Sequence, residues 1–225
     1  MEFLIYMAIL ILIPLWAQMR VQGAYAKYSK VPSSSQIPGA LVARKILDQN
    51  GLYDVRVEEV RGRLSDHYDP RSKTVRLSSG NYHGHSVAAA AIAAHEVGHA
   101  IQDQQNYAFL RIRHSLVPVA SLGSNLSWIL IMVGLFAQMT NLIGLGILFM
   151  AAAVLFQLVT LPVEFNASNR AMDQVVSLGI IQNNEERETK KVLNAAALTY
   201  VAAALVAVME LIRFVLIYMG MQQED

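Results

Sequence analysis

Long apolar segments alternate with polar segments along this chain, and their lengths predict about four transmembrane helices. The first apolar segment, residues 3–19, contains no charged side chain. A signal peptide has a basic region before its apolar run and small residues at a cleavage site, but here Glu2 precedes the run and bulky side chains stand near its end. Residues 1–19 are therefore predicted to form an uncleaved transmembrane helix that kinks or ends near Pro14.

A second apolar stretch, residues 115–163, has no formally charged side chain. About 20 residues of helix cross the hydrocarbon core of a membrane, so this stretch is too long for one crossing. Residues 139–141 (Met-Thr-Asn) provide the natural turn within it. We therefore predict a transmembrane hairpin of two helices over residues 115–161.

The last apolar stretch predicts a fourth transmembrane helix over residues 195–220. It contains Glu210 and Arg213, which lie one helical turn apart and can pair with each other. A charged side chain inside a membrane helix is a candidate for function. The ordinary alternative is an ion pair that faces the other helices or lies near the membrane surface.

The polar segments between these helices indicate a folded region. Residues 20–114 hold 13 of the 18 Lys and Arg residues. The local patterns predict, in chain order, a loop over 22–38, a helix over 39–50, a strand within 53–60, a turn-like segment over 61–71, a strand over 73–79 and a helix over 87–104 that Ser86 caps. This region is thus predicted to be a small α+β domain with a short β-sheet.

The basic residues also predict the orientation in the membrane. They gather at the ends of the spans that border residues 20–114 and 162–194, and the hairpin turn has none. By the positive-inside rule, these two polar segments lie in the cytoplasm and both termini lie outside. The predicted order of parts is a first helix at 1–19, a cytoplasmic region at 20–114, a hairpin at 115–161, a cytoplasmic segment at 162–194 and a last helix at 195–220.

Composition supports a membrane protein and limits its chemistry. Apolar residues make up 54% of the chain and charged residues only 16%, against about one quarter in soluble domains. The net charge of +1 gives no indication of a nucleic-acid partner. There is no Cys, so any metal ion must be held by His and carboxylate side chains.

Two histidines four residues apart, His95 and His99, enclose Glu96 in the segment HEVGH. On a helix this spacing places both imidazoles on one face, where they can hold a tetrahedral zinc ion. Glu96 lies beside the first ligand and can take a proton from zinc-activated water. A catalytic zinc site is therefore predicted, because a structural site normally has four protein ligands and does not need this Glu.

A catalytic zinc ion needs a third protein ligand, which must come from the same side of the membrane. The candidates there are His67, His83, His85, His114, Glu164, Asp173, Glu185, Glu186 and Glu188. Glu164 is the best placed, because it directly follows the third predicted span and can meet the helix that leads into the second. The alternative is that Glu164 caps a helix start at the membrane surface.

The chain also resembles a known family over nearly its whole length. The resemblance rests on the segments HEVGHAIQD, LPVEFNASNRA and KVLNAAALTYVAAAL, and on the apolar hairpin between the first two. They resemble the YugP-like family of neutral zinc metallopeptidases of bacterial membranes and, more distantly, the HtpX-like membrane proteases. The resemblance implies zinc ligands at His95, His99 and Glu164, as in gluzincins, with Glu96 as the catalytic base.

One position departs from the more distant pattern. Ser168 stands where HtpX-like proteins have an Asp that can orient a ligand His. Ser168 can still form a hydrogen bond, without a charge, and Asp103 or Asp173 are the alternatives for this role. Peptide cleavage also needs a group that stabilises the oxyanion. Arg170 is preferred over the other candidates, which are His67, Tyr82 and Tyr200.

The prediction is therefore a multi-pass membrane protein, mainly α, with a zincin-like endopeptidase domain in the cytoplasm. Its substrates would be membrane or unfolded polypeptides that pair with the edge of the strand at 73–79. An intramembrane protease of the site-2 type is disfavoured, because polar residues follow the motif at once and spans two to four contain no Asp. The remaining alternative is a non-catalytic zinc-containing scaffold for other membrane proteins, and association with these or with a second copy stays open.

Overall fold

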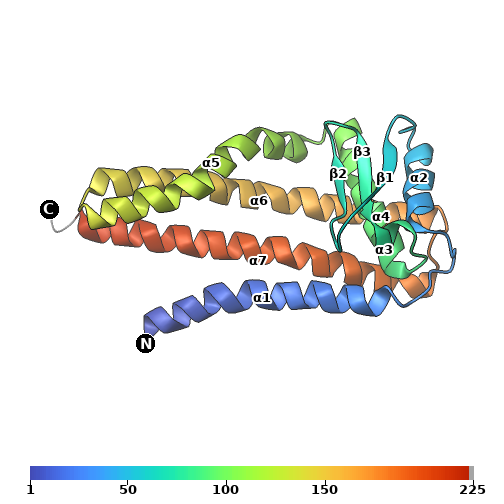
Figure 1. Cartoon of the computed structure of the whole chain (residues 1–225), viewed down its shortest axis with the longest axis horizontal. Coiled ribbons are helices and arrows are strands. Elements are labelled where there is room, and N and C mark those ends of the chain that lie inside the picture. Colours follow the sequence, from blue (N-terminus) through green and yellow to red (C-terminus); the bar gives the residue numbers. More distant parts are fainter. Residues whose placement is uncertain (223–225) are drawn as a thin grey trace. The chain divides into compact units, whose positions relative to one another are not determined.

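Four long helices carry the apolar segments in the computed structural model (Figure 1). The structure describes residues 1–222, and for Glu2 and Asn183 it describes only the backbone. They are α1 (Glu2–Tyr28), α5 (Ala108–Phe136), α6 (Thr140–Ser177) and α7 (Asn183–Met221). Within the described residues, these four are long and apolar enough to cross a membrane. The prediction of about four transmembrane helices is thus met in number, length and composition.

The chain divides into two compact units. The apolar unit consists of residues 1–14 and 108–162 and of the chain from Tyr200 onward. The mixed unit consists of residues 15–107 and 163–199 and contains helices and strands. Three of the long helices therefore contribute one end to each unit.

Glycines let α5 and α6 pack closely in the apolar unit. A Cβ added to Gly123 would lie 2.6 Å from the backbone oxygen of Phe149, and one added to Gly134 would meet Ile143 at the same distance. Small residues are the usual device for close helix contact in membranes, where no hydrophobic effect drives helices together. Arg213 of α7 lies over the rings of Phe3 and Tyr6 of α1, at 5.1 and 4.4 Å from their centroids, as a cation–π contact.

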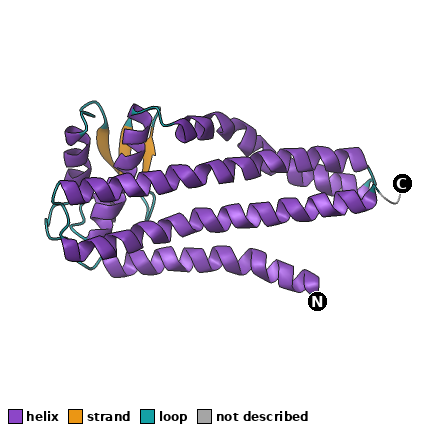
Figure 2. Ribbon diagram, turned by 180° about the vertical axis from the view of Figure 1, so that it is seen from behind, coloured by secondary structure: helices purple, strands orange, loops and turns teal. Residues whose placement is uncertain are grey.

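The small sheet of the mixed unit has the order β1-β3-β2, drawn in orange in Figure 2. Strand β1 (Arg56–Val60) pairs in parallel with β3 (Thr74–Ser78), and β2 (His67–Asp69) pairs antiparallel with the other side of β3. The central position of β3 makes one prediction wrong, because the strand at 73–79 has no free edge. The turn-like segment at 61–71 contains the strand that covers it, and three residues are too few to show an alternating pattern.

The core of the mixed unit contains buried side chains of the sheet, of α1, α6 and α7 and of two shorter helices. Helix α2 (Gly39–Gln49) buries Val42, Ala43, Ile46 and Leu47, which recur at helical spacing, and contacts both the sheet and α4 (Val87–Gln104). Gly51 follows α2 with a φ of 71°, a left-handed conformation that favours glycine at a helix end.

Helix α4 (Val87–Gln104) is buried on nearly every side, and its bounds confirm the predicted helix. Ser86 begins it, because its side chain accepts a hydrogen bond from the Ala89 backbone N–H at 3.1 Å, as predicted. The alanines of its first half have no long side chains, which allows α2 and the sheet to approach closely. A short helix, α3 (Ser79–Tyr82), connects β3 to this region.

Two helix boundaries differ from the predictions. Helix α1 continues through Pro14 to Tyr28, so it does not end near Pro14, and residues 22–28 are helical, not loop. Tyr25 and Tyr28 are buried in the core of the mixed unit, and this packing extends the helix beyond its apolar segment. Helix α6 likewise continues to Ser177, well beyond the predicted end of its span at 161.

Candidate metal centre

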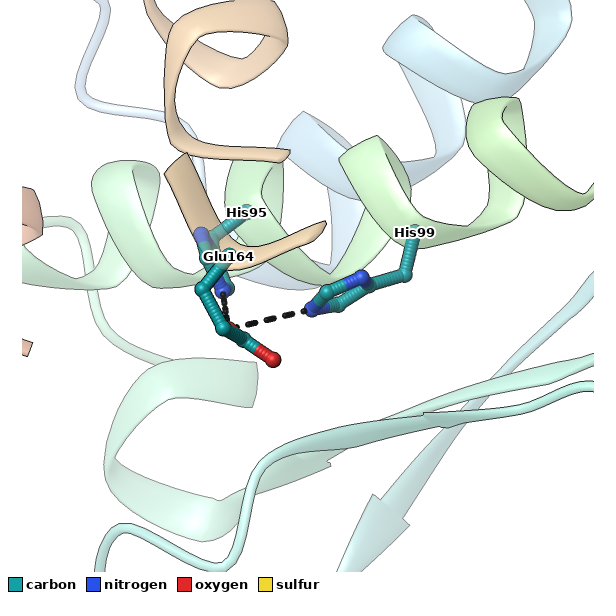
Figure 3. Close-up of side chains that lie close together, drawn as sticks. All are labelled: His95, His99 and Glu164. Atoms are coloured by element: carbon teal, nitrogen blue, oxygen red, sulfur yellow. Dashed lines mark hydrogen bonds and ion pairs between the residues drawn. The ribbon is translucent and has the colours of Figure 1, made fainter. Parts of the chain in front are cut away.

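His95 and His99 project from one face of α4 toward a common point (Figure 3). Their ring centroids lie 4.9 Å apart and their ring planes meet at 85°. Both side chains are nearly buried, with 12% and 11% of their surface exposed. The i, i+4 spacing therefore places both imidazoles on one face of the helix, as the sequence predicts.

Glu164 reaches the same point from α6. Its Oε2 lies 3.3 Å from Nε2 of His95 and 3.6 Å from Nε2 of His99, and the residue is 2% exposed. Among the described residues, these three form a group whose donor atoms lie within 4.8 Å of one another and could hold a metal ion. The other predicted candidates for a third ligand are not part of this group.

The donor set fits a zinc ion. Zinc bonds of about 2.0–2.1 Å in a tetrahedron place neighbouring donor atoms roughly 3.3 Å apart, close to the separations between the Glu164 oxygen and the two imidazole nitrogens. Two imidazoles and one carboxylate are also the donors of many catalytic zinc sites, in which the fourth position stays open. No thiolate is available to complete a closed structural site.

Hydrogen bonds at the far nitrogen of each imidazole direct Nε2 to the common point. Ser168 Oγ lies 3.2 Å from Nδ1 of His95, and Gln102 Oε1 lies 3.0 Å from Nδ1 of His99. An Nδ1–H that donates to these oxygens leaves Nε2 free to bind a metal ion. The prediction that Ser168 can hydrogen-bond in place of an Asp is confirmed. Asp103 instead accepts a hydrogen bond from Tyr68.

Gly98, between the two histidines, determines how closely α4 and α6 approach. A Cβ at this position would lie 2.6 Å from the backbone oxygen of Ala167, which is three residues beyond Glu164. Real Cβ atoms do not come so near to a backbone oxygen. The absence of a side chain at Gly98 thus allows the helix with two candidate ligands to lie against the helix with the third.

Replacing Gly98 by Ala is expected to lower both the melting temperature and the affinity for zinc. The added methyl group must push the two backbones apart, and overpacking of this kind costs about 1–3 kcal/mol. Gly23→Ala in α1 is the matched control, because nothing lies within 4 Å of its added Cβ and alanine favours the helix. Thermal melting and chelator competition on both variants provide the measurement, and wild-type zinc affinity in Gly98→Ala would contradict this account.

Glu96 is buried close to the three candidate ligands, with 8% of its surface exposed. Burial raises the pKa of its carboxyl group above the ordinary value, and the negative charges of Asp66 and Glu164 add to this, whereas His95 and His99 oppose it. Burial lowers the pKa of the His99 imidazole, but the hydrogen bond and charge of Glu164 outweigh it, so that this pKa also lies above its ordinary value.

Several other predicted site residues have partners elsewhere. His67 contacts the Ser65 backbone oxygen through Nδ1, and the exposed His83 contacts Glu59. Glu185 is buried, but it accepts hydrogen bonds from the backbone N–H groups of Ser34 and Gln182. Asp173 is exposed on α6, and His114 belongs to the apolar unit.

Arg170, the predicted oxyanion stabiliser, forms hydrogen bonds with neighbouring amides. Its Nε donates to Asn166 Oδ1 at 2.7 Å, and its Nη1 donates to Gln105 Oε1 at 2.7 Å. Two of its five N–H donors are thus used within the protein. Its role at an oxyanion stays a prediction.

Sequence reasoning missed two residues of this site. Gln102 follows His99 by three positions, so helical spacing alone places it on the same face, and this signal was available in the sequence. Asp66 adds negative charge near Glu96 and accepts hydrogen bonds from Ser78 and Asn81. No local pattern around Asp66 indicates this position.

Comparison with known proteins agrees with the geometry. The family model described as "Putative neutral zinc metallopeptidase" matches residues 3–219. A Bacillus subtilis (strain 168) protein named "Putative membrane protease YugP" is 55% identical over 210 residues, which cover 93% of each chain. No solved structure matches the chain. Because the family match spans nearly the whole chain, the three candidate ligands included, this protein belongs to the family described as putative neutral zinc metallopeptidases.

Proposed function

We propose that this protein is a membrane-embedded zinc endopeptidase that hydrolyses peptide bonds of membrane or unfolded proteins. The observation that carries the proposal is the convergence of His95, His99 and Glu164, with Glu96 buried beside them. The basic residues that border the polar segments support a cytoplasmic position for the site. Helix α4 is not among the four candidate spans, which argues against cleavage within the bilayer.

The side chains of this site have distinct roles in the proposed reaction. His95, His99 and Glu164 would hold the zinc ion. When bound, zinc supplies a Lewis acid that polarises the scissile carbonyl and lowers the pKa of water. Glu96 accepts a proton from the attacking water and passes it to the leaving amine, as a general base and then a general acid.

The sheet suggests where an extended substrate would bind. Strand β3 lies in the centre of the sheet, so its edge cannot take a peptide. Strand β2 forms one end of the three-stranded sheet and contacts α4, the helix that carries His95 and His99. We therefore place the substrate along β2, where it would add a strand by backbone hydrogen bonds.

Removing zinc is the direct test of this function. The protein purified in detergent is expected to hold one zinc ion per chain and to cleave unfolded casein. A strong chelator should abolish cleavage, and stoichiometric zinc should restore it, whereas magnesium should not, because it prefers oxygen ligands in an octahedron. Undiminished cleavage by metal-free protein would refute the proposal. Zinc binding without any cleavage would favour the non-catalytic scaffold.

A further inference from the structure

We propose that Gln102 is a positioning residue that orients His99. The same side-chain amide forms hydrogen bonds that hold α6, the helix that carries Glu164, against α4. The proposal rests on the zinc site of the proposed function and adds to it a residue that contacts one ligand on α4 and the backbone next to the ligand on α6. It concerns the binding of the metal, not the chemical step.

The amide of Gln102 is completely buried, with 0% of the residue exposed, and three hydrogen bonds surround it. Its Oε1 lies 3.0 Å from Nδ1 of His99. Its Nε2 donates to the backbone oxygen of Val163 at 2.8 Å and to Oδ1 of Asn166 at 2.9 Å. One side chain of α4 therefore contacts a ligand on its own helix and the residue that precedes the ligand on α6.

These contacts permit one orientation of the amide. Both N–H groups of Gln102 face acceptors, since Val163 offers a backbone carbonyl and Asn166 offers Oδ1. A flipped amide would bring its oxygen against these two acceptors. The Gln102 oxygen must then face His99 and accept a hydrogen bond from Nδ1–H, and in the neutral imidazole a proton on Nδ1 leaves Nε2 without one. That is the tautomer that binds a metal ion through Nε2.

Asn166 is held in turn by a charged residue. Arg170 Nε donates to the same Oδ1 of Asn166 that Gln102 contacts, at 2.7 Å, and Arg170 also donates to Gln105. Two donors on Oδ1 determine which way the Asn166 amide points. The result is a chain of hydrogen bonds from Arg170 through Asn166 and Gln102 to His99.

The alternative is that Gln102 only satisfies buried polar groups and stabilises the packing of α4 on α6. The two roles differ in what a substitution changes. Loss of stability without a change in the distance between α4 and α6 lowers the melting temperature and leaves the affinity for zinc in the folded protein unchanged. Loss of a contact that orients a ligand typically lowers metal affinity 10–100-fold.

The test compares Gln102→Met with Gln174→Met in the full-length protein in detergent. Gln174 lies on α6, the helix that carries Glu164, and its Oε1 accepts a hydrogen bond from Asn50 at 2.8 Å, away from the candidate ligands. Chelator competition with zinc is expected to show an affinity about 10–100-fold lower for Gln102→Met and unchanged for Gln174→Met. The cobalt-substituted Gln102→Met protein should show a shifted visible absorption spectrum, because His99 is free to rotate.

If Gln102→Met does not fold, substitutions of Asn166 test whether the hydrogen bonds of Gln102 affect zinc affinity. Asn166→Asp keeps an acceptor for both Gln102 and Arg170 and should retain wild-type zinc affinity, whereas Asn166→Leu should lower it. An unchanged zinc affinity and cobalt spectrum in Gln102→Met would overturn the positioning role of Gln102 and leave the proposed function standing. If Gln102→Met does not fold, the same result in Asn166→Leu would do so. A wild-type protein that binds no zinc would instead overturn the proposed function.

Discussion

Glu96→Gln is expected to lose peptide hydrolysis and to keep its zinc ion. The amide has nearly the shape of the carboxyl group, so the buried site should stay packed, and none of the three candidate ligands is changed. An amide cannot accept the proton of the attacking water, and general base catalysis typically contributes 10²–10⁴-fold to the rate. We therefore expect kcat on unfolded casein to fall by about 10²–10⁴-fold at unchanged zinc content.

Glu185→Gln is the matched control for this prediction. Glu185 is a second buried carboxylate of the mixed unit, and it accepts hydrogen bonds from backbone N–H groups outside the metal group. Its substitution should lower thermal stability while turnover per folded molecule stays near the wild-type value. Equal kcat in Glu96→Gln and the wild type would contradict this prediction. It would mean that another group acts as the base or that a contaminating enzyme cleaves the casein.

The opposite result is expected for Glu164→Gln, in which the zinc ion itself should be lost. The Oε2 of Glu164 lies near both imidazoles, and the side chain is 3% exposed, so water cannot easily replace it. A neutral amide oxygen is a weaker ligand for zinc than a carboxylate. Zinc affinity should fall by more than the roughly 10–100-fold that the loss of an outer hydrogen bond costs.

Asp173→Asn removes a carboxylate from the same helix, nine residues farther along, where it is exposed. This control should keep wild-type zinc affinity and cleavage, as measured by chelator competition and casein hydrolysis. Unchanged zinc occupancy in Glu164→Gln would mean that the third ligand has been misidentified. The two predictions separate the two roles, since one variant keeps zinc without activity and the other loses both.

Local features of the sequence account for much of the fold. The lengths of the apolar segments predict the four long helices, because a helix that crosses a membrane must be apolar over about 20 residues. Ser86 predicts the start of α4, because a cap depends on residues only three positions apart. The positions of His95 and His99 on one helical face follow from their spacing for the same reason.

The sequence is a weaker guide where tertiary contacts decide the structure. Residues 22–28 of α1 become helical because Tyr25 and Tyr28 are buried in the core of the mixed unit. The local sequence pattern does not indicate that these two side chains are buried. Strand β2 covers the edge of β3 through backbone hydrogen bonds, which depend little on the identity of its three residues. The expectation of a substrate along β3 failed for this reason.

The candidate metal centre shows the same division. The sequence by itself determined the pair of histidines, the neighbouring Glu96 and a set of histidine and carboxylate candidates for the third position, among which Glu164 was preferred. Only the tertiary structure brought Oε2 of Glu164 to within 3.6 Å of both imidazoles, since residues so far apart in the chain meet through the packing of two helices. That packing depends on the missing side chain of Gly98 and on the buried amide of Gln102, whose partners a linear pattern does not contain.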